Sequence, residues 1–105
     1  MRESKIEAYL KQKVEKAGGI CLKFISPSNN GVPDRIILHP GLPKPTFVET
    51  KAPGQSPRKL QLAVHRKMEK YGADVYILDD KEKIDRFLSE KGLYPVKTKK
   101  ETKTP

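Results

Sequence analysis

The chain has 105 residues, of which 35% are hydrophobic and 7% aromatic, so it can form one domain with a single modest core. Its formal net charge of +9 attracts nucleic-acid phosphates or another anionic surface, and charge alone does not distinguish between them. The single Cys21 excludes an internal disulfide, and because no segment resembles a signal peptide or the roughly 20 apolar residues of a membrane span, we expect a cytoplasmic protein.

The first half of the chain predicts one helix and three strands. Apolar residues at helical spacing predict a first helix that ends at a glycine pair, and its apolar side comprises Ile6, Leu10, Val14 and Ala17. Alternating side chains predict a strand over residues 20–25, with Cys21 as a small buried side chain. A loop of turn formers then leads to short strands at residues 35–39 and 47–51, which we expect to pair as a hairpin.

The second half predicts a helix, a strand and a short helix. The longer of these two helices starts at Pro57 with Ser56 as its cap and ends at Gly72. Its apolar stripe comprises Leu60, Val64, Met68 and Tyr71. An apolar run at residues 73–79 predicts a strand that is buried on both faces. The last helix, at residues 81–92, carries the apolar residues Ile84, Phe87 and Leu88.

The predicted order is α-β-β-β-α-β-α, which indicates an α/β fold with a mixed sheet flanked by helices. One domain is expected over residues 1–95. Residues 96–105 contain four lysines against one glutamate, and this composition predicts a basic, disordered tail.

The stretch FVETKAPG, residues 47–54, places an acid and an ammonium close together on one strand. Because side chains alternate along a strand, Glu49 and Lys51 project from the same side. Asp34 ends the turn GVPD just before the second strand, so the hairpin brings it towards Glu49. Two carboxylates with a main-chain carbonyl suit Mg²⁺, and Lys51 can contact an attacking water or a developing negative charge. The pattern indicates metal-assisted phosphodiester hydrolysis.

The same residues carry a resemblance to a known family. GVPD, followed fifteen residues later by ETK, resembles the PD-(D/E)XK nuclease signature. NNGVPDRIIL, FVETKAPGQSPRKLQ and YGADVYIL together resemble the VRR-NUC domain over roughly residues 3–90. The resemblance implies a restriction-endonuclease-like fold and a DNA endonuclease that uses Mg²⁺ or Mn²⁺. It also implies a branched substrate such as a four-way (Holliday) junction, in DNA repair, recombination or phage DNA processing, inside a bacterial or phage-infected cell.

The resemblance implies a role for each matching residue. The catalytic set is Asp34, Glu49, Lys51 and Gln61. The metal set is Asp34, Glu49, the Thr50 carbonyl and Glu7. Lys51 would position or activate the attacking water, and Gln61 would orient Lys51 or contact phosphate.

Simpler interpretations of the site residues stay open. Glu49 and Lys51 could form an exposed cross-strand pair worth about 0.2–1 kcal/mol. Asp34 could be a turn former, since aspartate is common after proline in turns. Glu7 lies four residues before Lys11, a spacing typical of an ordinary ion pair on a helix surface.

Four further residues are candidates for DNA contact. Arg58 and Lys59 lie at a predicted helix N-terminus, which favours phosphate, although a solvated basic turn explains them too. His65 lies one turn after Gln61, and we interpret it as a phosphate contact or packing residue, because no cysteine or second histidine lies at metal-ligand spacing. Asn30 belongs to a polar loop that suits phosphate or main-chain contacts.

Two expectations concern the protein as a whole. The alternative to an enzyme is a non-catalytic, basic nucleic-acid-binding module. A restriction-type nuclease is a third interpretation that we do not expect, because no recognition domain fits in 105 residues. A homodimer is expected, since a small domain has little apolar area and a four-way junction needs two cuts. Candidate interface residues are Tyr9, Ile84, Phe87 and Leu88, which could equally pack inside one subunit.

Overall fold

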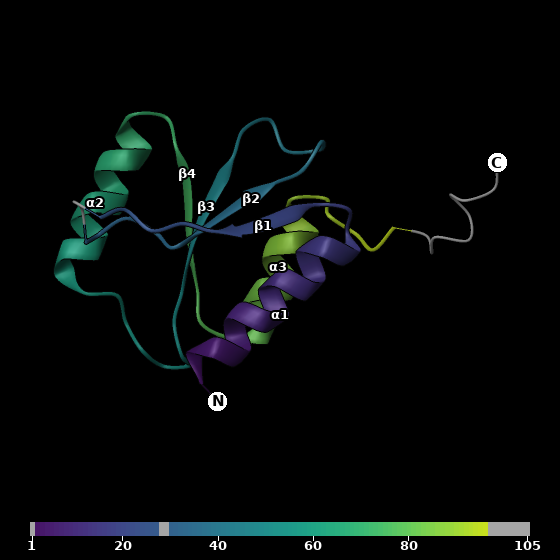
Figure 1. Cartoon of the computed structure of the whole chain (residues 1–105), viewed down its shortest axis with the longest axis horizontal. Coiled ribbons are helices and arrows are strands. Elements are labelled where there is room, and N and C mark those ends of the chain that lie inside the picture. The colour runs from purple at the N-terminus through teal and green to yellow at the C-terminus, as the bar shows by residue number, and fades with distance from the viewer. Residues whose placement is uncertain (1, 28–29, 97–105) are drawn as a thin grey trace.

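A computed structural model describes residues 2–27 and 30–96, and it shows a mixed sheet with helices on both sides (Figure 1). In chain order the elements are α1 (Glu3–Lys16), β1 (Ile20–Lys23), β2 (Arg35–Leu38), β3 (Thr46–Thr50), α2 (Lys59–Lys70), β4 (Asp74–Leu78) and α3 (Lys81–Glu90). The order and the fold class are those predicted from the sequence.

The four strands follow one another across the sheet in the order β1-β2-β3-β4. The first three are antiparallel, so β2 and β3 form the predicted hairpin, with Ile36 opposite Phe47. Helix α2 then returns the chain so that β4 runs parallel to β3, with Ile77 opposite Glu49. Because β4 is an edge strand, only Leu78 within it is buried, and the prediction of burial on both faces was wrong.

Helices α1 and α3 pack together against one face of the sheet and form the core with it (Figure 1). The core comprises Ile6, Leu10, Val14, Ala17, Cys21, Ile37, Val48, Leu78, Ile84, Phe87, Leu88 and Leu93. Ile84, Phe87 and Leu88 are buried within one subunit, so of the two uses open to these residues, a core or a dimer interface, the structure shows the core. The fourth candidate, Tyr9, is half-buried, and its hydroxyl donates to Asp85 Oδ1 at 2.8 Å.

Helix α2 begins two residues later than predicted. Ser56 is exposed and the N-cap is Arg58. The Arg58 N–H donates to Gln61 Oε1 at 2.8 Å, so a side chain from inside the helix satisfies a main-chain donor at its start. Because Gln61 supplies this bond, the helix does not need Ser56 as a cap.

Helix α2 also turns an unexpected side towards the sheet. Its buried residues are the polar Gln61 and His65. Within the predicted apolar stripe, Leu60 and Tyr71 are 55% and 82% exposed. The side of α2 that faces the sheet is therefore the one that meets the polar residues of β3.

The C-terminal end of the described chain returns to α1. The Val96 N–H donates to Lys16 O at 2.8 Å, and the rest of the predicted tail, residues 97–105, lies outside the described residues. Within residues 2–27 and 30–96, no helix combines the length and the apolar content needed to cross a membrane.

Candidate active site

Strand β3 brings Glu49 and Lys51 together beneath α2. Lys51 directly follows the strand, and its N–H donates to Leu78 O at 3.1 Å, which extends the pairing with β4 by one residue. Lys51 Nζ lies 3.7 Å from Glu49 Oε2, and the two side chains are only 14% and 7% exposed. The interpretation as an exposed surface pair was therefore wrong.

Gln61 fixes the orientation of the Glu49 carboxylate. Its Nε2 donates to Glu49 Oε2 at 3.2 Å, while its Oε1 accepts the Arg58 N–H. Both ends of the amide are thus in use, and flipping the amide would break both bonds. The structure places Gln61 against Glu49 rather than at the surface of the helix.

The environment of Glu49 favours its protonated form. Burial raises the pKa of this carboxyl to about 7, and the nearby charge of Asp34 acts in the same direction. The Lys51 ammonium opposes both effects. Carboxyls with a pKa near neutrality are concentrated at functional sites, because structural carboxyls are usually exposed or fully paired.

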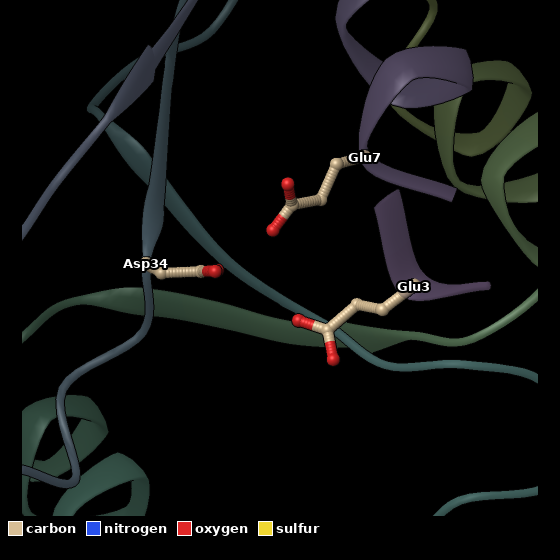
Figure 2. A group of neighbouring side chains, drawn as sticks. All are labelled: Glu3, Glu7 and Asp34. Carbon is tan, nitrogen blue, oxygen red and sulfur yellow. The ribbon is translucent and has the colours of Figure 1, made fainter. Parts of the chain in front are cut away.

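Three other carboxylates converge beside this pair. Figure 2 shows Glu3 and Glu7 on the first turns of α1 pointing towards Asp34, which precedes β2. One oxygen from each of the three lies within 4.8 Å of the others. Burial raises the pKa of Asp34, and the charge of Glu7 raises it further. Glu3 was missed from the sequence, although it lies one helical turn before Glu7 on the same side of the helix.

Glu7 connects the acidic cluster to the sheet. Its Oε1 accepts a hydrogen bond from Arg35 Nη2 at 3.3 Å, and its Oε2 accepts a hydrogen bond from Thr50 Oγ1 at 3.3 Å. Lys11 instead pairs with Glu15 at 2.7 Å. The interpretation of Glu7 and Lys11 as a helix-surface ion pair was therefore wrong.

The acidic cluster has the chemistry of a divalent-cation site. All three groups offer carboxylate oxygens, the ligands that Mg²⁺ and Mn²⁺ prefer. Asp34 Oδ1 is buried, and no other described residue hydrogen-bonds to it. A bound cation would satisfy this oxygen and relieve the repulsion among the three groups. Glu49 lies outside this group of three, although the charge of Asp34 acts on it.

Comparisons with known proteins identify the family of the chain. No protein-family model matches the chain. The chain is 44% identical over 82 residues, which cover 78% of it and 87% of the relative, to "Putative nuclease p44" of Acyrthosiphon pisum secondary endosymbiont phage 1. A solved structure described as "VRR_NUC domain" matches with a TM-score of 0.73 and 28% identity, over 83% of this chain and 94% of that one. The chain belongs to the VRR-NUC nuclease family.

The remaining site candidates of this VRR-NUC chain divide between surface and interior. Arg58, Lys59 and Asn30 are exposed. His65 is 4% exposed, so little of its surface is available to a phosphate. Neither ring nitrogen of His65 has a hydrogen-bond partner within the described part of the chain.

Proposed function

We propose that this VRR-NUC chain is a divalent-metal-dependent endonuclease that hydrolyses phosphodiester bonds in DNA, with Mg²⁺ or Mn²⁺ as its cofactor. The observation that carries the proposal is the buried Glu49, which both Lys51 and Gln61 contact, beside the acidic cluster. A non-catalytic binding module gains nothing from buried carboxylates, because they repel phosphate and raise the free energy of the folded state.

The side chains of this site have distinct parts in the proposed reaction. When bound, a divalent cation supplies Lewis-acid chemistry and lowers the pKa of a bound water. The acidic cluster of Glu3, Glu7 and Asp34 would hold it, and Glu49 with the Thr50 carbonyl would complete the ligand set from β3. The Lys51 ammonium, beside Glu49, would hold the attacking water or stabilise negative charge on the phosphate. Gln61 would keep the Glu49 carboxylate in one orientation.

The basic surface would bring DNA to the site. Exposed Arg58 and Lys59 lie at the start of α2, where main-chain N–H groups also favour phosphate, and Asn30 lies in the loop before Asp34. The net charge of +9 should make affinity fall steeply as salt rises. Arg58→Gln should weaken binding in proportion across all DNA sequences, because a phosphate contact carries no sequence information.

We further propose that the substrate is branched DNA, such as a four-way junction, and that the enzyme is a homodimer in the cytoplasm of a bacterial or phage-infected cell. A two-fold pair presents two sites in matching orientation to the two strands that must be cut. The matched relative, whose name describes it as a nuclease, is a phage protein. Sedimentation equilibrium should give twice the 11.9 kDa of one chain, whereas a monomer would contradict the pairing.

Cleavage assays test the activity directly. The protein is incubated with labelled linear, flapped, nicked and four-way-junction DNA, with Mg²⁺, with Mn²⁺ and with a chelator. We expect metal-dependent cleavage that is fastest on branched DNA, and loss of cleavage in Asp34→Asn and Glu49→Gln. Both variants should bind DNA at least as tightly as the wild type, because each loses a negative charge. Binding without cleavage under every condition would favour the non-catalytic module.

A further inference from the structure

Tyr71, at the C-terminal end of α2, presents its aromatic ring to solvent. It is 82% exposed, more than any other large hydrophobic residue that the structure describes. The other three tyrosines, Tyr9, Tyr76 and Tyr94, each have a side-chain hydrogen bond or ring contact, whereas within residues 2–27 and 30–96 the Tyr71 side chain has neither. Its main chain is fixed, because the Tyr71 N–H donates to Met68 O at 3.0 Å. A firmly held, uncovered aromatic ring suits a flat partner that stacks on it.

The ring borders an open hollow between α2 and the loop that leads to Asp34. The hollow has a volume of about 290 Å³, and it is lined by Val32, Val64, Lys67, Met68 and Tyr71. All of these side chains except that of Lys67 are aliphatic, thioether or aromatic. Small-molecule sites have volumes of roughly 300–1,000 Å³, so a hollow of this size suits one flat ring system better than a folded segment of protein.

The hollow lies next to the proposed active site. Val32 precedes Asp34 by two residues, and two residues of chain span at most about 7 Å. On the helix, Val64 follows Gln61, the partner of Glu49, by three residues, or about 4.5 Å along the axis. Successive nucleotides of a duplex strand are about 3.4 Å apart along the axis. A DNA strand with a phosphate at the acidic cluster therefore has a base within reach of the hollow, about two nucleotides away.

Positive charge runs beside the hollow along α2. Lys59, Lys67 and Lys70 are all exposed, and their spacing places them on one side of the helix, next to the apolar stripe. Lys44 joins them from the loop before β3, since its Nζ donates to Gly72 O at the end of the helix. The helix itself contains four Lys or Arg residues and one acidic residue. This charge complements a phosphate backbone and repels another basic chain.

We propose that the hollow binds one unpaired nucleobase of the DNA, which stacks on the Tyr71 ring while the neighbouring lysines hold the flanking phosphates. This inference rests on the proposed nuclease function, and it gives that function a source of selectivity for branched DNA. Turning a base out of a duplex costs free energy, and the cost is least for a base that is already unpaired. Branched DNA and single strands therefore supply this site with a base more readily than a continuous duplex does.

DNA binding in the presence of a chelator tests the site apart from cleavage. The probes are a single-stranded thymidine oligonucleotide, an oligonucleotide of the same length that lacks every base, and a linear duplex. Tyr71→Ala should weaken binding of the thymidine strand by about 5- to 150-fold and leave the other two affinities within about twofold, because only the first probe offers a base to stack. Tyr71→Phe, which keeps the ring, should retain wild-type affinity for all three. Tyr94→Ala removes another exposed tyrosine and should change none of them.

Two results of this experiment would contradict the base site. Unchanged affinity of Tyr71→Ala for the thymidine strand would show that the ring does not contact a base. An equal loss for the strand that lacks bases would assign Tyr71 to the sugar-phosphate backbone. Either result overturns the proposal.

Photo-crosslinking locates the bound base. 5-Iodouracil crosslinks under ultraviolet light to an aromatic side chain that stacks on it. Placed in the unpaired arm of a flapped DNA, it should crosslink to Tyr71, as mass spectrometry of the crosslinked peptide would show. Placed within the paired arms, it should not. A crosslink that forms only at other residues would move the base away from this hollow and overturn the proposal.

A second copy of the chain is the alternative occupant of an apolar hollow. Sedimentation equilibrium should give equal masses for the wild type and Tyr71→Ala. A halved mass in Tyr71→Ala, with unchanged affinity for the thymidine strand, would assign the hollow to a dimer interface and overturn the base site.

The nuclease function fails or stands by a separate result. Base-dependent binding by a wild-type protein that cleaves no DNA with any metal would support the base site and refute the nuclease function. Metal-dependent cleavage by the wild type, with no base-dependent loss of binding in Tyr71→Ala, would do the reverse.

Discussion

The side-chain amide of Gln61 donates to Glu49 Oε2 at 3.2 Å and thereby joins α2 to the strand that carries the site. The other end of the amide accepts the Arg58 N–H at the start of the helix. One side chain therefore links the beginning of α2 to the orientation of the buried carboxylate. The helix and the site should respond together when Gln61 is changed.

We expect Gln61→Leu to lower the cleavage rate by about 10- to 100-fold, because Glu49 is no longer held in one orientation. The free energy of unfolding should fall by about 1–3 kcal/mol, since Glu49 Oε2 and the Arg58 N–H both lose a partner. Initial cleavage rates and urea unfolding measure the two effects. Gln12→Leu, exposed on α1, is the matched control and should change neither quantity. Wild-type rates in Gln61→Leu would remove Gln61 from the catalytic set.

The pKa of Glu49 predicts how stability depends on pH. Its folded-state pKa is about 7, against an ordinary value of 4.5. Between these two pH values the folded protein keeps a proton that the unfolded chain releases, so this group lowers stability as pH rises from about 4.5 to 7, with no further change above. Glu49→Gln cannot ionise, and above pH 7 it should be more stable than the wild type by up to about 3 kcal/mol.

Urea unfolding of both proteins from pH 4 to 8.5, without divalent metal, measures this difference. It should be small near pH 4, where the wild-type carboxyl is protonated in both states, and should grow towards pH 7. A difference that does not vary with pH would show that Glu49 ionises normally in the folded protein.

The acidic cluster predicts that divalent cations stabilise the protein without DNA. Mg²⁺ or Mn²⁺ at about 100 times its dissociation constant should add about 2.7 kcal/mol to the free energy of unfolding. Asp34→Asn removes the carboxylate that faces Glu3 and Glu7 and should abolish most of this gain. Glu15→Gln, at an exposed position of α1, should leave it intact. An equal gain in Asp34→Asn would place the cation elsewhere.

The sequence predicts local structure and the site motif better than it predicts the packing of α2. Alternating side chains and flanking turn residues identified the strands that carry or adjoin Asp34, Glu49 and Lys51, because strand alternation and turn chemistry are local. The stripe from Leu60 to Tyr71 identified a helix, but periodicity does not reveal whether a stripe is covered. Long-range contacts, such as the one between Gln61 and Glu49, decide which side faces inward.

Long-range contacts also decide the role of α3 and the place of Glu3, near the two ends of the described chain. The apolar residues of α3 suit a core and a dimer interface equally well in the sequence. In the structure they belong to the core, because α3 packs against α1 within one subunit. Glu3 carries no motif, and it joins the site only because the first turn of α1 lies beside Asp34 (Figure 2). The spacing of residues along the chain places Glu3 on the same side of the helix as Glu7, but it does not show that Asp34 lies beside that side, nor which element covers α3.

The loop that leads to Asp34 packs against α2 at Gly31. A Cβ atom on Gly31 would lie 2.8 Å from Val64 Cβ and 2.9 Å from Leu60 O, closer than packed atoms approach. Alanine at this position must therefore displace the loop or the helix. We expect Gly31→Ala to lower the free energy of unfolding by about 1–3 kcal/mol and to slow cleavage, because Asp34 follows three residues later. Urea unfolding and initial rates measure both effects.

The partner of this contact provides the control. Val64→Ala should cost about 1 kcal/mol by itself, since it removes methyl groups from a half-buried position. Combined with Gly31→Ala, it removes the contact with the Val64 methyl groups, so the double variant should be more stable than the sum of the two single changes predicts. Recovery should be partial, because the Cβ atom at position 64 and the main-chain oxygen of Leu60 both remain. Simple additivity of the two changes would show that Gly31 and α2 do not press against each other.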